Sequence, residues 1–256
     1  MNPPRNLRGF LFVGMLAFTC GRLSAETVEE LIKKGDGFDK RLNAATALEY
    51  YLPAEKLEPD NAELLVRIAR QYRHLMSRTS SKKEKLRLGG LSLDYARRAA
   101  ALAPNDAEAQ LSPAISYGKM LPFMGSKDQF NASPRIREAV ARTLDLDPAN
   151  DTAWHILGRW NRVLADVGAV KRALAGAIYG ELPKTTNGDA ERCLKKAIAL
   201  NPNRLIHYIE LGRVYIQMGR TKEARQAIEK GLRLPNREID DPEMRSIGQE
   251  ALKKLQ

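Results

Sequence analysis

The side chains best suited to chemistry in this sequence are arginines. A guanidinium group forms forked hydrogen bonds to carboxylates and phosphates, so arginines that line one groove could hold an acidic peptide, a chain-terminal carboxylate or a phospholipid headgroup. The helix pattern described below places five arginines and one histidine on the concave surface of a stack of helix pairs. These candidate ligand-binding residues are Arg70, Arg73, His155, Arg159, Arg162 and Arg213. The alternative is that the arginines pair with acids on neighbouring helices or face solvent.

The other polar residues show no pattern typical of catalysis. His74, His155 and His207 are scattered, one to a repeat, without an acidic or cysteine neighbour at the spacing of metal ligands. The sequence contains no glycine-rich phosphate loop, no nucleophile elbow and no pair of catalytic carboxylates. We therefore predict that the protein is not an enzyme and has no catalytic residue, no metal site and no cofactor.

Helices that end in similar ways must position the candidate residues. The clearest unit spans residues 188–203, and its closing proline motif recurs at Pro59, Pro104 and Pro148. Small residues recur where paired helices approach closely, and large apolar residues recur where they fill gaps between pairs, which is typical of tetratricopeptide repeats. The pattern predicts an all-α, tetratricopeptide-like α-solenoid of about five helix pairs, with long inserts and a C-terminal capping helix within residues 241–256.

The closing prolines lie farther apart than the usual period of about 34 residues, which indicates inserts. In the second repeat we expect a longer connection within residues 74–90 and an extended second helix. In the third, Pro113 and Pro134 predict short or kinked helices. The longest insert, residues 163–187, contains an apolar stretch at 167–179 that predicts a short helix. We expect that helix to pack on the solenoid, with membrane contact as the alternative.

The N-terminus has the features of a secretory signal. Arg5 and Arg8 precede an apolar run at residues 9–21, which is shorter than a membrane-spanning helix. We predict a cleaved signal peptide at residues 1–25, a solenoid domain at 26–256 and a periplasmic or secreted protein; the alternative is a membrane anchor through residues 9–21. Cleavage removes three arginines and no acid, so the net charge falls from +11 to +8 and the mature chain stays basic.

Several short sequence motifs within the lengthened repeats resemble those of the regulator of microtubule dynamics family. They are the acidic-Ala-Glu-Leu-Leu run and Arg-Ile-Ala-Arg helix within residues 60–70, the Ser-Arg-Thr-Ser linker at 77–80, the Tyr-Ala-Arg-Arg-Ala helix at 95–99, and the long insert after Trp154, Leu157 and Gly158. The resemblance covers roughly residues 30–256. It implies a helical tetratricopeptide-like fold, no enzymatic activity, and roles in microtubule association or organelle contacts, with lipid handling in some members.

Together these features predict a non-enzymatic scaffold or adaptor that binds an anionic peptide or protein in a concave groove. The alternatives are a lipid-binding or lipid-transfer module and, by resemblance alone, a microtubule-associated regulator. The expected partner is a protein or peptide with acidic character, with phospholipid as the alternative. Nucleic acid is not expected, because the basic residues lack interleaved exposed aromatics. Tubulin is a partner only if the signal-peptide prediction is wrong, since secretion would separate the chain from the cytoplasm.

Overall fold

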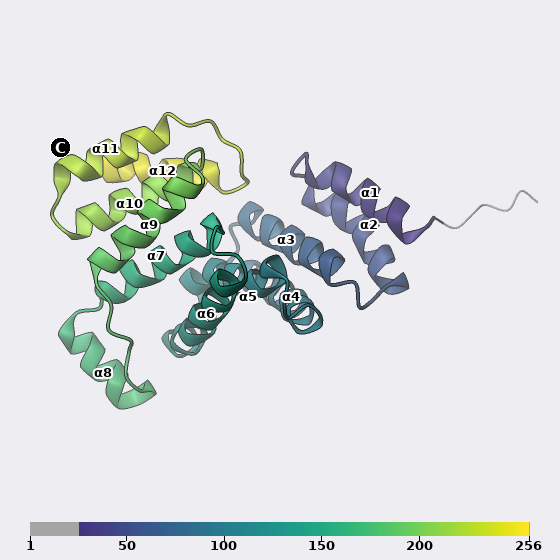
Figure 1. The fold of residues 1–256 in the computed structure, drawn as a ribbon, viewed down its shortest axis with the longest axis horizontal. Coiled ribbons are helices and arrows are strands. Elements are labelled where there is room, and N and C mark those ends of the chain that lie inside the picture. Colours follow the sequence, from purple (N-terminus) through teal and green to yellow (C-terminus); the bar gives the residue numbers. More distant parts are fainter. Residues whose placement is uncertain (1–25, 256) are drawn as a thin grey trace, which may run out of the picture.

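The computed structural model describes residues 26–255, and within that range the regular secondary structure is helical (Figure 1). This confirms the all-α prediction, whereas the predicted signal peptide at residues 1–25 lies outside the described residues. The helices are α1 Val28–Asp39, α2 Ala44–Leu57, α3 Ala62–Arg78, α4 Lys82–Leu102, α5 Ala107–Met120, the 3-10 turn η1 Leu121–Phe123, α6 Ser126–Leu146, α7 Asp151–Ala165, α8 Ala169–Tyr179, α9 Asn187–Leu200, α10 Leu205–Gln217, α11 Thr221–Leu232 and α12 Asp241–Lys253.

The recurring proline motifs end one helix and begin the next. After three of these prolines, a short polar side chain caps the following helix: Asn61, Asp106 and Asn150 accept hydrogen bonds from the backbone N–H three residues ahead, at 3.0, 2.7 and 3.0 Å. Such a cap satisfies one of the backbone donors that a helix start leaves unpaired, and it contributes about 1 kcal/mol. The motif therefore fixes both the end and the start of neighbouring helices.

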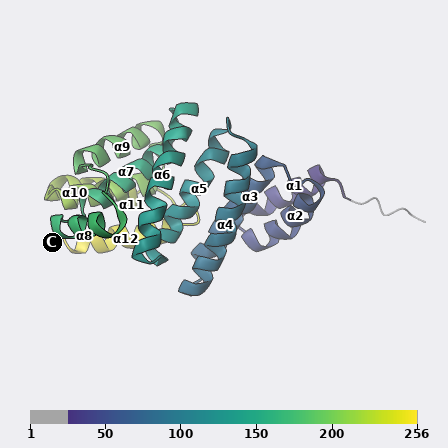
Figure 2. The same ribbon diagram turned by 90° about the horizontal axis from the view of Figure 1, so that it is seen from below.

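Five helix pairs stack in sequence order. They are α1 with α2, α3 with α4, α5 with α6, α7 with α9, and α10 with α11. Figure 2 shows the first pair at one end of the array and α9 to α12 at the other. Glycines permit the close contact within pairs, because a Cβ atom on Gly158 would lie 2.6 Å from Leu194 and one on Gly212 would lie 2.3 Å from Ile228. The predicted solenoid of about five pairs is confirmed.

Helix α12 covers the last pair, as predicted. It packs against α10 and α11. Met244, Ile247 and Ala251 contact the buried cluster around Ile209 and Ile228. Covering this apolar end is necessary because the last pair of a solenoid has no following repeat to bury its face.

Two expectations about the middle repeats need correction. The second repeat has no longer connection, since residues 79–81 alone join α3 to α4; both helices are long instead, and the extended second helix is confirmed. In the third repeat the helices are not short, because α6 runs for 21 residues through Pro134 and α5 continues through Pro113. Burial on both sides of each proline, for example at Leu111 and Ala114, offsets the hydrogen bond that proline removes.

The predicted helix in the longest insert is confirmed as α8, but it does not pack on the solenoid as we expected. It stands away from the helix pairs (Figure 1), and Val170, Leu174 and Ile178 are 84%, 60% and 58% exposed. Hydrogen bonds from Arg172 to the carbonyls of Leu164, Leu182 and Pro183 tether its base. No helix among residues 26–255 is long and apolar enough to cross a membrane.

Candidate functional site

The predicted arginine column is engaged in contacts within the protein. Arg70 forms an ion pair with Asp39 at 2.5 Å. Arg73 is 6% exposed and donates hydrogen bonds to Ser112 and Ser116, both at 3.2 Å. Burial lowers the pKa of Arg73 to about 10, yet the group keeps its charge at neutral pH. Arg73 therefore joins α3 to α5 inside the core and offers no free surface to a ligand.

The remaining arginines surround Glu210 on α10. The Nε atom of Arg162 lies 2.6 Å from one oxygen of Glu210, and Nη1 of Arg213 lies 3.0 Å from the other. Arg159 is half-buried nearby, and Nη1 of Arg162 also donates to Gln217 at 2.9 Å. Burial alone would raise the pKa of Glu210, but the charges of the three arginines outweigh it and lower that pKa to about 2. Glu210 thus remains an anion and orients two of the predicted binding arginines.

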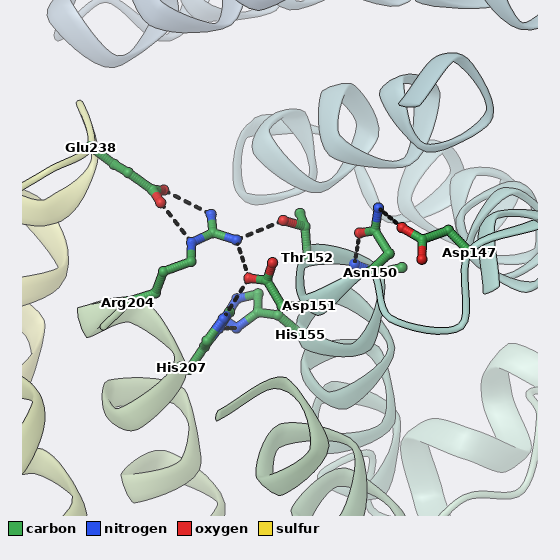
Figure 3. Close-up of polar contacts among 9 residues, drawn as sticks. Asp147, Asn150, Asp151, Thr152, His155, Arg204, His207 and Glu238 are labelled. Atoms are coloured by element: carbon green, nitrogen blue, oxygen red, sulfur yellow. Dashed lines mark hydrogen bonds and ion pairs between the residues drawn. The ribbon is translucent and has the colours of Figure 1, made fainter. Parts of the chain in front are cut away.

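His155 belongs to a buried polar network that the sequence did not reveal (Figure 3). Its Nδ1 lies 3.1 Å from Nδ1 of His207, whose Nε2 lies 2.9 Å from Asp151. A neutral His207 satisfies both contacts if it donates from Nε2 to Asp151 and accepts at Nδ1 from His155. Burial lowers the pKa of both histidines, which favours this neutral pair.

Arg204 extends this network to the segment before α12. Its Nη1 donates hydrogen bonds to Asp151 and Thr152, both at 2.6 Å. Its Nε and Nη2 donate to the two carboxylate oxygens of Glu238 at 2.6 and 2.9 Å. Burial raises the pKa of Asp151, yet hydrogen bonds from His207 and Arg204 outweigh it and lower that pKa to about 2. Although an aspartate and a histidine pair here, His207 is fully buried and both ring nitrogens are occupied. The network is therefore arranged to hold helices together.

Residues 233–240, here called the crossing segment, connect distant repeats. Asp240 at its end accepts hydrogen bonds from Ser77 Oγ at 2.7 Å and Lys119 Nζ at 2.6 Å. Ser77 lies on α3 and Lys119 on α5, so the connection between α11 and α12 reaches back toward the second and third pairs (Figure 1). The charge of Lys119 lowers the pKa of Asp240 against the effect of burial. No local sequence pattern indicates a contact over this separation.

Two of the predicted residues line a hollow at the C-terminal end of the array. This C-terminal hollow has a volume of about 340 Å³ and lies between α7, α10 and α12. Its charged and polar lining comprises Arg162, Arg213, Gln217, Glu250 and Lys254, and its apolar lining comprises Ile216, Ile247, Ala251 and Leu255. The structure thus brings Arg162 and Arg213 together, whereas Arg70, Arg73, His155 and Arg159 do not line it.

The described residues hold no group of three or more His, Cys, Asp or Glu side chains placed to bind a metal ion. Cys193 is a buried free thiol, and burial raises its pKa.

The sequence matches the family described as Regulator of microtubule dynamics protein 1-3 over residues 25–256. The chain belongs to this family. Among curated relatives, Regulator of microtubule dynamics protein 1 of Mus musculus is 27% identical over 230 residues, covering 85% of this chain and 74% of the relative. The Caenorhabditis elegans protein of that name is 26% identical over 179 residues, covering 70% and 79%. The resemblance inferred from the stretched repeats is confirmed.

Solved structures confirm the fold of this regulator of microtubule dynamics family member. A thermophilic TPR protein from Thermus thermophilus superposes with a TM-score of 0.61 at 19% identity, covering 89% of this chain and all of the other. PilF from Pseudomonas aeruginosa superposes with a TM-score of 0.55 at 14% identity, covering 89% and 91%. At such identities the likeness establishes the tetratricopeptide-like architecture alone.

Proposed function

We propose that this family member is a non-enzymatic protein-interaction scaffold that binds an acidic peptide segment with apolar side chains in the C-terminal hollow. The observation that carries this proposal is the placement of Arg162 and Arg213 beside a wall of aliphatic side chains. Arginines recognise carboxylates through paired hydrogen bonds, and an adjacent apolar wall lets the side chains of a bound peptide leave water. Concave surfaces of helix-pair solenoids are suited to extended binding of this kind.

The lining of the hollow has three cations, Arg162, Arg213 and Lys254, and one carboxylate, Glu250, so its charges favour an anion even though Glu210 pairs with two of the cations. Glu210 engages Nη1 of Arg213, whose side chain lines the hollow and is 34% exposed, so part of Arg213 remains accessible. Lys254 adds a further positive charge at the rim. Ile216 is 38% exposed and supplies apolar surface beside Arg213. A bound carboxylate would share Arg213 with Glu210 without displacing the buried contact to Arg162.

Fluorescence anisotropy with a labelled peptide containing aspartates and leucines tests this site. We expect Arg213→Gln to weaken binding by about tenfold, which corresponds to the loss of one charge-assisted hydrogen bond. Arg70→Gln is the matched control, because Arg70 is also a partly exposed, ion-paired arginine but lies outside the hollow. A peptide with asparagine in place of aspartate should bind weakly to both variants. Equal effects of the two substitutions, with helical content unchanged, would show that the hollow is not the peptide site.

Lipid binding is a second candidate, favoured by the exposure of α8. Val170, Leu174 and Ile178 recur every four residues and therefore lie on one face of that helix, with Lys171 exposed beside them. Such a helix could rest in the interface of an anionic membrane. Sedimentation with vesicles containing phosphatidylglycerol should carry down the wild-type chain and leave Leu174→Glu in solution. Wild-type protein that stays in the supernatant excludes this role.

A microtubule-associated role is supported by family membership, since the relatives are named regulators of microtubule dynamics. It competes with our proposal that residues 1–25 are cleaved and that the protein is periplasmic or secreted. Fractionation of the native host combined with N-terminal sequencing decides between them. A processed chain found outside the cytoplasm excludes contact with tubulin, whereas an unprocessed cytoplasmic chain excludes the secretory proposal.

A further inference from the structure

A second, larger cavity lies away from the C-terminal hollow, between α6, α7, α9 and the end of the long insert. Its volume is about 570 Å³, which is within the range of small-molecule sites. Both tryptophans of the chain, Trp154 and Trp160, line it, and we call it the tryptophan cavity. The lining also includes Leu157, Asn161 and Cys193, which places the cavity between the first and second helices of the fourth repeat.

One wall of the tryptophan cavity is apolar and held in place. Trp160 donates its indole N–H to Ser133, at 3.0 Å from Oγ, and Trp154 donates to the carbonyl of Pro148 at 2.9 Å. Because these bonds satisfy the only polar atom of each ring, what the rings offer the cavity is hydrocarbon surface. Leu157 extends this surface. The wall suits an aromatic or aliphatic group better than a hydrated ion.

The rest of the lining carries an excess of positive charge. The lining contains one carboxylate, that of Asp189, and four basic side chains, which are Arg137, Lys184, Arg192 and Lys196. Asp189 is already occupied, since it caps α9 through Thr186 and forms an ion pair with Arg192.

Within residues 26–255, neither Lys184 nor Lys196 forms an ion pair with an acid, and Arg137 stacks over the ring of Trp160 at 5.3 Å from its centroid. Lys184 and Lys196 are therefore available to a ligand, whereas Arg137 is held against the Trp160 ring.

The floor of the cavity ties the insert to the repeat. Asn161 on α7 donates to Cys193 Sγ on α9 at 3.6 Å, and its carbonyl oxygen accepts from Thr185 in the insert at 2.6 Å. Thr185 thereby fixes the segment that carries Lys184. Because burial raises the pKa of the Cys193 thiol, this residue stays neutral and adds no negative charge to the floor. The positive lining is thus held by a defined set of contacts.

We propose that the tryptophan cavity binds a small organic anion, with its apolar part against Trp154, Leu157 and Trp160 and its negative group at Lys184 and Lys196. Carboxylates, sulfonates and phosphates all have the required charge, and an aromatic body matches the two indoles best. The proposal does not rest on peptide binding, because the C-terminal hollow is lined by other residues.

Tryptophan fluorescence tests the proposal directly, because both fluorophores line the cavity. Phenyl phosphate combines a ring with a dianion, whereas inorganic phosphate and phenol each supply one half. We expect a saturable change with phenyl phosphate and at least about tenfold weaker binding of either half. An absent response to phenyl phosphate would overturn the proposal. Inorganic phosphate that binds as tightly as phenyl phosphate would also overturn it, because this indicates a surface contact with the anion alone. Phenol that binds as tightly would overturn it too, because this indicates an apolar cleft.

Lysine substitutions identify the anion contact. The double variant Lys184→Gln with Lys196→Gln should weaken phenyl phosphate about tenfold while leaving phenol unchanged. Lys195→Gln is the matched control, because Lys195 precedes Lys196 on α9 but pairs with Glu191 at 2.7 Å and lies outside the cavity. Thermal unfolding should be similar in all variants because both substituted lysines are exposed. Equal losses in the control, or no loss in the double variant, would overturn the assignment.

Discussion

Removal of Glu210 should show that the arginines of the C-terminal hollow are part of the framework of the protein. Glu210 is 1% exposed and its carboxylate contacts Arg162, which is 9% exposed by its side chain. We expect Glu210→Ala to lower the free energy of unfolding by about 3 kcal/mol, because it leaves a buried guanidinium without its counter-charge. That value is at the lower end for such losses, since Arg162 keeps its bond to Gln217 and Arg213 is partly solvated.

The lowered pKa of Glu210 gives a second estimate of the free energy of unfolding that its carboxylate contributes. This pKa falls from 4.5 to about 2 in the folded state, and each unit corresponds to about 1.4 kcal/mol, so the carboxylate contributes about 3 kcal/mol above pH 4.5. A group with a depressed folded pKa loses its contribution as the pH falls. The stability difference between wild type and Glu210→Ala should therefore narrow as the pH falls from about 4.5 toward 2.

Urea unfolding followed by circular dichroism measures these differences. The double variant Glu210→Met with Arg162→Met serves as the control, because it removes both charges and fills the space with apolar groups. We expect the double variant to lose considerably less free energy of unfolding than the summed losses of Glu210→Met and Arg162→Met measured singly. A loss below about 0.5 kcal/mol for Glu210→Ala, or additive losses in the double variant, would refute the reasoning that a buried ion pair fixes these arginines.

Three other perturbations separate the parts of the fold that contribute stability from those that do not. Gly212→Ala should cost about 1–3 kcal/mol in chemical denaturation because its Cβ would clash with Ile228, whereas Gly90→Ala, which meets no neighbour, should gain about 0.5–1 kcal/mol. Equal effects would show that close approach is not the constraint at Gly212. Lowering the pH from 7 to 5 should reduce the free energy of unfolding, because the unfolded chain gains protons near pH 6.5 that the folded histidines resist. Burial lowers the pKa of His74 to about 4, and this shift alone should reduce the free energy of unfolding by about 2 kcal/mol between pH 7 and pH 5. A urea midpoint that stays constant over this pH range would contradict the prediction. The histidines with lowered pKa values are His74, His155 and His207. Leu174→Ser on exposed α8 should change the free energy of unfolding by less than about 0.5 kcal/mol, and a larger loss would place α8 in the core.

The helix pairs could be predicted from the sequence because their signals are local. Small residues such as Gly158 and Gly212 mark contacts within a pair, and the polar residues after the prolines cap the next helix. The errors occurred where tertiary burial outweighs local preference. Pro134 reads as a helix breaker, yet α6 continues through it because Ile136 and Val140 bury the same helix. The exposed position of α8 could not be predicted either, because the apolar composition of a helix does not indicate what that helix will contact.

The contacts of the arginines were only partly visible in the sequence. Glu210 stands three residues before Arg213, so one ion pair could have been inferred from helical spacing. The contact to Arg162 joins positions 48 residues apart, and that between Arg70 and Asp39 spans 31. Such pairs depend on how successive repeats are rotated, which the pattern of apolar residues does not determine. The prediction of a groove lined by arginines was therefore made from the positions of those residues alone, without knowledge of the acids that pair with them.

The two cavities suggest why the irregular parts of this solenoid matter for function. In a regular array each helix pair buries its faces against its neighbours, which leaves little enclosed space between them. Here the insert after α7 supplies Lys184 and Thr185 to one cavity, and the capping helix supplies Ile247 and Lys254 to the other. Each cavity thus combines a rigid wall from the repeats with a segment outside the repeat pattern. Under the two binding proposals, changes in those segments would alter ligand preference while the packing that holds Trp160 or Arg162 stays intact. We therefore expect specificity in this family member to follow the insert and the cap.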